Sequence, residues 1–228
     1  MKGKQLAGEK ACEYVKEGMV VGLGTGSTVF YAIQKLGKLV KDGLKITCVS
    51  TSKASTILAK ELGIPVNDFS LVKYVDLTID GADEVDENFD GIKGGGGALL
   101  HEKLVAVSSK EIIWIIDDKK LVKKLGKFPL PVEVIPFAKE KLFTIFDELG
   151  FKPAYRMKDE TFFITDGGNH IIDLHLGEIE FPLDLHNRLK LMPGVVETGL
   201  FLHMADRVIV GYEDRVEVLK RKGKSIDD

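Results

Sequence analysis

The sequence contains few of the residues that build disulfide-rich or zinc-binding proteins. Its 228 residues include two cysteines, Cys12 and Cys48, which lie far apart and look unpaired. No pair of the five histidines has the spacing of zinc ligands on a helix, so we expect no metal site. Unpaired cysteines are typical of a reducing compartment, which predicts a cytoplasmic protein.

The chain also lacks long apolar runs and a strong charge of either sign. No segment has transmembrane length, the first ten residues have no signal-peptide core, and the formal net charge is −3. The basic residues are dispersed apart from 220–224, which we expect to be a solvated tail. These absences predict neither a nucleic-acid nor a membrane partner. With 44% hydrophobic and 29% charged residues, the chain can bury one large core or two modest ones.

The first glycine-rich segment reads GLGTGST and spans residues 22–28. It follows a short apolar strand, Met19 to Leu23, and precedes a helix that ends at Gly43. A strand, a glycine turn and a helix together direct backbone N–H groups and the helix dipole at a phosphate.

A dinucleotide is not the predicted ligand of this turn. The third glycine of a GxGxxG pattern is replaced by Ser27 in one frame and by Val29 in the other, and no Gly-Lys pair of a Walker loop follows. The hydroxyls of Thr25, Ser27 and Thr28, with the backbone of Gly26, suit a small phosphomonoester instead. A plain tight turn capped by Ser27 is the alternative.

A second cluster of polar and glycine residues lies between Asp76 and Leu104. Asp80 and Asp83 follow the alternating Val75, Leu77 and Ile79, which places them at the exit of a strand. The lone cation Lys93 is followed by glycines 94–97 and by a predicted helix from Ala98 to Val107, with Glu102 in its second turn. Glycine N–H groups can converge on an anionic oxygen, so this stretch has the components of a proton-transfer site.

Other acidic residues in this stretch have simpler explanations. Asp86, Glu87 and Asp90 are expected to lie in a solvated loop. A calcium-binding EF-hand loop is partly matched by Asp86, Asn88, Asp90 and Gly91, but the position that requires glutamate is Gly97, and a strand precedes the loop where a helix should. We therefore reject a calcium site.

Strands and helices alternate through the first half of the chain, which predicts an α/β fold with a Rossmann-like parallel sheet. After the prolines at 129, 131 and 136 the order becomes β-α-β-β-α-β, with a helix from Ala138 to Leu149 and a hairpin turn at 166–169. This order is typical of a smaller ferredoxin-like α+β domain. We expect a Rossmann-like domain of residues 1–128 and 205–228, to which the strand Arg207 to Tyr212 returns, and a ferredoxin-like domain of residues 129–204.

Several segments resemble one enzyme family, ribose-5-phosphate isomerase of type A, in the family's order along the chain. They are GTGST at 24–28, DGADE at 80–84, KGGGGAL at 93–99, HEK at 101–103, GKFPLPVEVIP at 126–136 and PGVVETGLF at 193–201. The resemblance implies interconversion of D-ribose 5-phosphate and D-ribulose 5-phosphate through an enediolate in the non-oxidative pentose phosphate pathway, without cofactor or metal. It also implies a homodimer or homotetramer.

The resemblance further implies roles for individual residues. Glu102 would accept the carbon-bound proton, and Lys93, Asp80 and Asp83 would be the other catalytic residues. The substrate would be lined by Thr25, Gly26, Ser27, Thr28, Asp80, Gly81, Ala82, Asp83, Lys93, Gly94, Gly95, Gly96 and Lys120. For the last contact, the adjacent Lys119 is an alternative.

Readings from other classes are less well supported. A sugar-phosphate-binding regulatory module of related fold would keep the phosphate turn but could lose the base, and it would usually carry a basic helix-turn-helix segment, which we do not recognise. The ordered match from residue 24 to residue 201 argues against a related deaminase or coenzyme A transferase.

Overall fold

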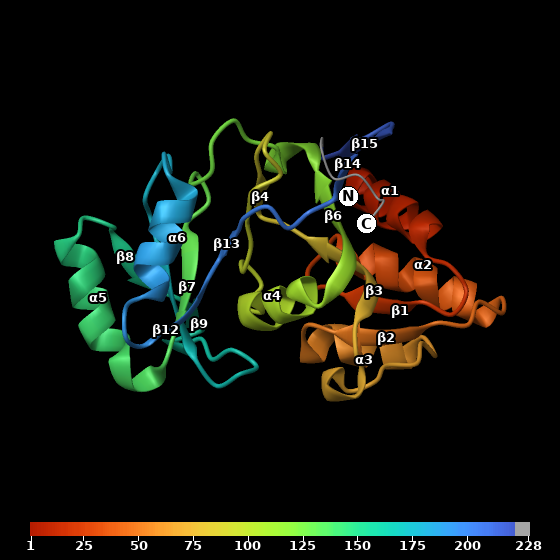
Figure 1. The fold of residues 1–228 in the computed structure, drawn as a ribbon, viewed down its shortest axis with the longest axis horizontal. Helices are drawn as coiled ribbons and strands as arrows, with labels where there is room; N and C mark the ends of the chain where they lie inside the picture. The colour runs from red at the N-terminus through yellow and green to blue at the C-terminus, as the bar shows by residue number, and fades with distance from the viewer. Residues whose placement is uncertain (222–228) are drawn as a thin grey trace. The chain divides into compact units, whose positions relative to one another are not determined.

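The computed structural model describes residues 1–221, and these form two compact units (Figure 1). Unit 1 comprises Met1–Ala82, His101–Leu121 and the segment from His203 onward, and unit 2 comprises Asp83–Leu100 and Val122–Leu202. The boundaries expected from the sequence, at 128/129 and 204/205, stay a prediction. No helix in the part of the chain described is long and apolar enough to cross a membrane.

Unit 1 is built on a six-stranded sheet with the order β15-β14-β6-β3-β1-β2. All neighbouring strands are parallel except β14 and β15, which are antiparallel. The strands are β1 (Val20–Leu23), β2 (Thr47–Ser50), β3 (Val75–Gly81), β6 (Ser109–Asp117), β14 (Arg207–Gly211) and β15 (Val216–Lys220). The helices are α1 (Lys2–Ala11), α2 (Val29–Lys41), α3 (Lys53–Glu61) and α4 (Leu99–Val107), with short 3₁₀ helices at Cys12–Tyr14, Phe69–Leu71 and Asp118–Lys120.

Both faces of this sheet are covered, as the nearly continuous apolar strands predict. Val21 and Leu23 of β1 belong to the large core formed with α1, α2 and α3. On the opposite face, Val105 of α4 packs in a smaller cluster with Val49 and Val75. Gly22 lies between these residues of β1 and faces α4, where a Cβ would come within 2.9 Å of Val105. A glycine at this position therefore allows α4 to pack closely against β1.

Unit 2 contains the predicted ferredoxin-like sheet, in the order β12-β7-β11-β8 and antiparallel throughout. Its helices α5 and α6 cover one face through a core that includes Val132, Phe146 and Leu189. The elements are β7 (Leu130–Val134), α5 (Lys139–Glu148), β8 (Pro153–Tyr155), β11 (His170–Leu174), α6 (Pro182–Lys190) and β12 (Val195–Thr198), with a 3₁₀ helix at Pro136–Ala138. The predicted α/β fold class, a Rossmann-like sheet with a smaller ferredoxin-like part, is confirmed.

Three details differ from the sequence-based expectations. Helical spacing predicts a first helix from about Lys4 to Gly18, but this helix ends at Ala11. The sequence also predicts a short strand at Pro65 to Asn67, where the structure has a single bridge between Cys48 and Val66. The turn at 166–169 is present, closed by the Thr165 N–H to the Asn169 carbonyl, but the strand before it, β10 (Thr161–Phe162), pairs with β9 (Met157–Lys158) and not with β11. Strands of two residues carry no periodicity from which their partners could be predicted.

Unit 2 also has a small sheet that the sequence did not predict. It consists of β4 (Glu84–Val85), β5 (Gly91–Ile92) and β13 (Leu200–Phe201), in the order β13-β5-β4. The expected solvated tail at 220–224 falls mainly outside the described residues. Lys220 lies inside that part of the chain, where it ends the edge strand β15.

Candidate active site

In unit 1, the phosphate turn connects β1 to α2 as the sequence predicts. Gly26 has a φ of +114°, and both Gly26 and Ser27 are exposed. The N-cap of α2 is Thr28, whose side chain makes no capping hydrogen bond, so Ser27 is not the cap that a plain turn would need. The exposed turn lies at the N-terminal end of a 13-residue helix, where an anion is favoured.

Asp80, at the end of β3, is hydrogen-bonded to this turn. Its side chain is 2% exposed, and its Oδ1 accepts hydrogen bonds from the backbone N–H of Thr25 (3.0 Å) and of Gly81 (2.7 Å). A Cβ on Gly24 would lie 1.9 Å from Asp80 Oδ1. The first glycine of GTGST is therefore required by the carboxylate of Asp80, and the structure brings these two sequence motifs together.

A cluster of hydroxyl groups supports the same turn. Thr25 Oγ1 lies 2.8 Å from Thr51 Oγ1 and 2.8 Å from Ser52 Oγ. Ser55 Oγ, in the first turn of α3, donates to the Gly24 carbonyl at 2.7 Å. The Thr25 hydroxyl is thus engaged within the protein, which leaves Ser27 as the more exposed hydroxyl of the turn.

Lys4 is a residue at this turn that the sequence analysis missed. Its ammonium donates to Ser27 Oγ at 2.9 Å and lies 3.8 Å from Asp117 at the end of β6. No local signal identified it, because the lysine lies on the first helix, far from the GTGST motif. It places an ammonium group, shared with the Asp117 carboxylate, beside the exposed hydroxyl of Ser27.

Lys119 and Lys120, which follow β6, differ in their exposure to solvent. Where the sequence predicts the start of another helix, the structure has only the 3₁₀ helix Asp118–Lys120. Lys119 is exposed, whereas Lys120 is half-buried. Lys120 is therefore the better placed of the two for a directed contact.

Glu102 lies in the first turn of α4, one turn earlier than expected, because the helix begins at Leu99. The residue is only 4% exposed. As the sequence predicts, the helix follows directly after the glycine run. A buried carboxylate at the start of a helix is held in a defined position, which is a requirement for a general base.

In unit 2, the small sheet positions Asp83 and Lys93. The Asp83 N–H donates to the Ile92 carbonyl at 2.8 Å, and the Lys93 N–H donates to the Gly199 carbonyl at 2.9 Å. The Lys93 side chain is 3% exposed, and its ammonium lies 5.2 Å from the centre of the Phe201 ring. The backbone of Lys93 is therefore held beside the pair of strands β5 and β13, which come from distant parts of the sequence.

The glycine loop, residues 94–97, follows Lys93. Gly94 and Gly97 have φ values of +100° and +79°, a conformation that glycine adopts without strain. The Gly95 N–H donates to Asp83 Oδ2 at 2.7 Å. The loop and Asp83 therefore form one hydrogen-bonded cluster within unit 2.

The expectation of a solvated loop at Asp86 and Asp90 is wrong, although Glu87 is exposed as expected. Asp86 is 9% and Asp90 is 8% exposed. Asp86 Oδ1 accepts from the backbone N–H groups of Asn88 (2.9 Å) and Asp90 (3.0 Å), and so closes the turn between β4 and β5. An aspartate that bonds to its own turn explains the burial without a metal.

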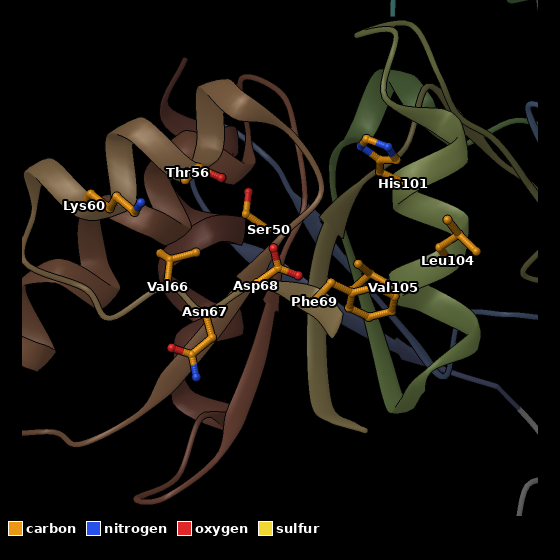
Figure 2. Close-up of a pocket in the computed structure, with 10 residues that line it drawn as sticks. All are labelled: Ser50, Thr56, Lys60, Val66, Asn67, Asp68, Phe69, His101, Leu104 and Val105. Atoms are coloured by element: carbon orange, nitrogen blue, oxygen red, sulfur yellow. The ribbon is translucent and has the colours of Figure 1, made fainter. Parts of the chain in front are cut away.

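A pocket of about 640 Å³ in unit 1 lies apart from these predicted residues (Figure 2). It is lined by Ser50, Thr56, Lys60, Val66, Asn67, Asp68, Phe69, His101, Leu104 and Val105. Ser50 and Thr56 both donate to the Ser52 carbonyl, and Asp68 accepts from Ser70. These three polar side chains are therefore satisfied within the chain. Among the residues described, no three His, Cys, Asp or Glu side chains are grouped as metal ligands would be.

The parallel sheet, with a glycine turn and a buried acid at its strand ends, belongs to the Rossmann-like class of α/β folds, which bind ligands at the carboxyl ends of their strands. The sequence pattern of one family, described as ribose 5-phosphate isomerase A (phosphoriboisomerase A), matches residues 47–215. The ribose-5-phosphate isomerase A of Streptococcus pneumoniae serotype 19F is 52% identical over 97% of this chain and 98% of its own length. That of Streptococcus gordonii is 52% identical over 95% and 97%.

Solved structures of ribose 5-phosphate isomerases are also similar to this chain. A D-ribose-5-phosphate isomerase in complex with phospho-erythronic acid has a TM-score of 0.92 and 40% identity, covering 96% of this chain and 97% of its own. The ribose 5-phosphate isomerase A of Methanocaldococcus jannaschii has a TM-score of 0.90 and 39% identity, covering 95% and 97%. The chain belongs to the ribose 5-phosphate isomerase A family.

Proposed function

We propose that this protein interconverts D-ribose 5-phosphate and D-ribulose 5-phosphate through an enediolate, as a step of the non-oxidative pentose phosphate pathway. The observation that carries the proposal is the identity of 52% to a ribose-5-phosphate isomerase A along 97% of the chain. A relative solved with phospho-erythronic acid, a phosphorylated sugar acid, supports a sugar phosphate as the ligand.

Glu102 is the proposed general base. It removes the proton from C2 of the aldose and returns it to C1 of the enediolate, which gives the ketose. Its burial, at 4% exposed, supports this role because a shielded carboxylate keeps the proton from exchanging freely with water. A positioned base typically contributes about 10²- to 10⁴-fold to the rate.

Lys93 and the N–H groups of Gly94 and Gly96 stabilise the negative oxygen of the enediolate, while the Gly95 N–H, which donates to Asp83 Oδ2 at 2.7 Å, holds that carboxylate in place. Lys93 has a backbone fixed by Gly199 and a side chain that is 3% exposed, so its charge acts in a poorly hydrated environment. Each well-directed donor to a developing oxyanion contributes about 3 to 4 kcal/mol. Several such donors together therefore contribute at least as much as the base.

Asp80 and Asp83 position the sugar hydroxyls and move the oxygen-bound protons. The residues Thr25 to Thr28 hold the phosphate, with the charge of Lys4 beside Ser27, and Lys120 makes a further substrate contact. Gly81 and Ala82 complete the lining next to Asp80. The rigid attachment of Asp80 to Thr25, at 3.0 Å, supports a fixed distance between the phosphate turn and the first catalytic acid.

We also propose that the protein acts in the cytoplasm as a homodimer or homotetramer. Two free, buried cysteines suit a reducing compartment. The oligomeric state is measured by light scattering coupled to size-exclusion chromatography. A monomer at the concentration at which the enzyme is active would contradict the second part of the proposal.

The main experiment measures ribulose 5-phosphate formation from ribose 5-phosphate in excess EDTA. Glu102→Gln should lower kcat by about 10³-fold, because the amide keeps the shape but cannot accept the proton. Glu61→Gln, an exposed helical glutamate of the same unit, is the matched control and should leave kcat unchanged. An inactive wild type that binds the sugar phosphate would favour a regulatory module. Full activity of Glu102→Gln would keep the family and reject Glu102 as the base.

A further inference from the structure

Arg156, just after β8, is paired with Asp173 of β11 inside unit 2. Its Nε donates to Asp173 Oδ2 at 2.9 Å, and its Nη2 bonds to Asp173 Oδ1. The two side chains are 14% and 17% exposed. This two-point contact fixes the plane of the guanidinium group, because both oxygens of one carboxylate are engaged.

The remaining terminal nitrogen of Arg156 reaches the glycine loop. Nη1 donates to the Gly94 carbonyl and to the Gly95 carbonyl, the second at 3.2 Å. The Gly94 carbonyl also accepts the N–H of Gly97 at 2.9 Å. A charged donor thus binds two consecutive carbonyls of a segment whose residues have almost no conformational preference of their own.

Peptide planarity transmits this contact to the opposite side of the loop. The Gly94 carbonyl shares a rigid plane with the Gly95 N–H, and the Gly95 carbonyl shares one with the Gly96 N–H. The Gly95 N–H in turn donates to Asp83 Oδ2 at 2.7 Å. Asp173, Arg156, the glycine loop and Asp83 therefore form a continuous series of hydrogen bonds.

We propose that Arg156 is a positioning residue for catalysis: by holding the carbonyls of Gly94 and Gly95, it directs the amide groups of the glycine loop and orients Asp83. The inference rests on the proposed function of that loop. Arg156 acts through the loop and does not itself bind the substrate.

The contact requires arginine rather than any cation. One guanidinium group presents donors to a carboxylate on one edge and to two carbonyls on another, whereas a lysine ammonium is a point charge on a flexible stem. Arg156→Lys keeps the charge but loses the planar donor set. It is therefore a more specific test than removal of the side chain.

The matched control is Arg207→Lys. Arg207, in β14 of unit 1, is also 14% exposed and also bonds to a carboxylate, that of Glu111. It contacts no residue of the glycine loop through that bond. A loss that results only from breaking a semi-buried arginine pair should appear in both variants.

The first readout is steady-state kinetics of isomerisation. Arg156→Lys should lower kcat about 10- to 100-fold with KM within about threefold, since complete loss of an oxyanion donor costs roughly 10²- to 10³-fold. Arg207→Lys should keep kcat within about twofold. Guanidinium ion, far below denaturing concentrations, should partly restore the kcat of Arg156→Ala and should not raise the kcat of Arg207→Ala. Equal kinetic losses in the two lysine variants, or no rescue, would overturn the proposal.

The second readout does not depend on activity. In protein labelled with ¹⁵N-glycine, the amide resonances of Gly95 and Gly96 should shift in Arg156→Lys and in Asp173→Asn, and stay in place in Arg207→Lys. Unshifted resonances would reject the positioning role even if the enzyme is active. Shifted resonances in a protein that does not isomerise ribose 5-phosphate would keep the structural inference and reject the proposed function.

Discussion

Asp80 and Asp83 are near neighbours in the sequence, but they are held in place by different means. Asp80 ends a strand of the parallel sheet in unit 1, and its carboxylate accepts two backbone N–H groups from its own strand and from the adjoining turn. Asp83 lies in unit 2 beside strands of two residues, and its carboxylate accepts from Gly95, whose own position depends on Arg156. Regular structure fixes the first residue, and distant side chains fix the second.

This difference separates robust parts of the proposed catalytic site from adjustable ones. A residue on a central strand cannot move without breaking several backbone hydrogen bonds. The carboxylate of Asp83 can reorient when the glycine loop that donates to it is displaced. We therefore expect substitutions around Asp80 to affect stability, and substitutions around Asp83 to affect turnover more than stability.

The largest expected contrast is between Gly24→Ala and Gly95→Ala. A Cβ on Gly24 would lie 1.9 Å from Asp80 Oδ1 and 2.6 Å from its Cα, whereas a Cβ on Gly95 would lie 2.8 Å from the Asp83 carboxylate, which can rotate. We expect Gly24→Ala to lower the free energy of unfolding by about 3 kcal/mol and Gly95→Ala by about 1 kcal/mol. Urea unfolding of both variants and of the wild type measures these differences in the free energy of unfolding.

Gly81→Ala is the control for that pair, since the nearest atom to its Cβ would be 3.5 Å away. It should cost less than Gly24→Ala although both lie next to Asp80. Equal losses for Gly24→Ala and Gly95→Ala would contradict the distinction between a rigid strand end and an adjustable loop.

Removing the predicted substrate contact of Lys120 should have a smaller effect, restricted to substrate binding. Lys120→Ala should raise KM about tenfold, equivalent to about 1.4 kcal/mol, with kcat nearly unchanged. The substitution Lys119→Ala, at the exposed neighbouring residue, should leave KM and kcat unchanged. A reversed result would assign the contact to Lys119.

The last prediction concerns the reactivity of the two thiols in the wild-type protein, which both lie in unit 1. Burial raises the pKa of Cys12 and of Cys48 to about 12, so both thiols stay protonated at neutral pH and ionise only above about pH 11. Alkylation by iodoacetamide at pH 8 should be about 10³-fold slower than that of a free cysteine. Because unit 2 has no cysteine, faster labelling in Gly24→Ala but not in Gly95→Ala would place the instability in unit 1. Rapid labelling of the wild type would contradict the burial of the thiols.

The same comparison explains what the sequence could predict. Asp80 was identified because Val75, Leu77 and Ile79 alternate along a strand, and the turn at residues 24–28 was identified because glycines follow such a strand. Both signals are local. They sufficed for the parallel sheet, for α2, and for the position of the glycine run before α4.

The missed features depend on contacts between distant segments. Arg156 and Lys4 act on loops far away in the sequence, and β13 reaches β5 only after the whole ferredoxin-like sheet has been traversed. Strands of two residues show no alternation, so β4 and β5 are not predicted by the sequence, which indicates only a solvated loop at Asp86, Glu87 and Asp90. The burial of Asp86 and Asp90 was missed for the same reason.

The order in which the chain visits its two units has a consequence for biosynthesis. Residues 109–117, which form β6, leave the ribosome before all of 122–202, whereas their neighbour β14 is made only afterwards. During that interval a strand edge containing Ile112 to Ile116 has no partner on one side. Such an edge is prone to intermolecular pairing, so translation through the ferredoxin-like segment is the stage at which a nascent chain of this protein depends most on chaperones.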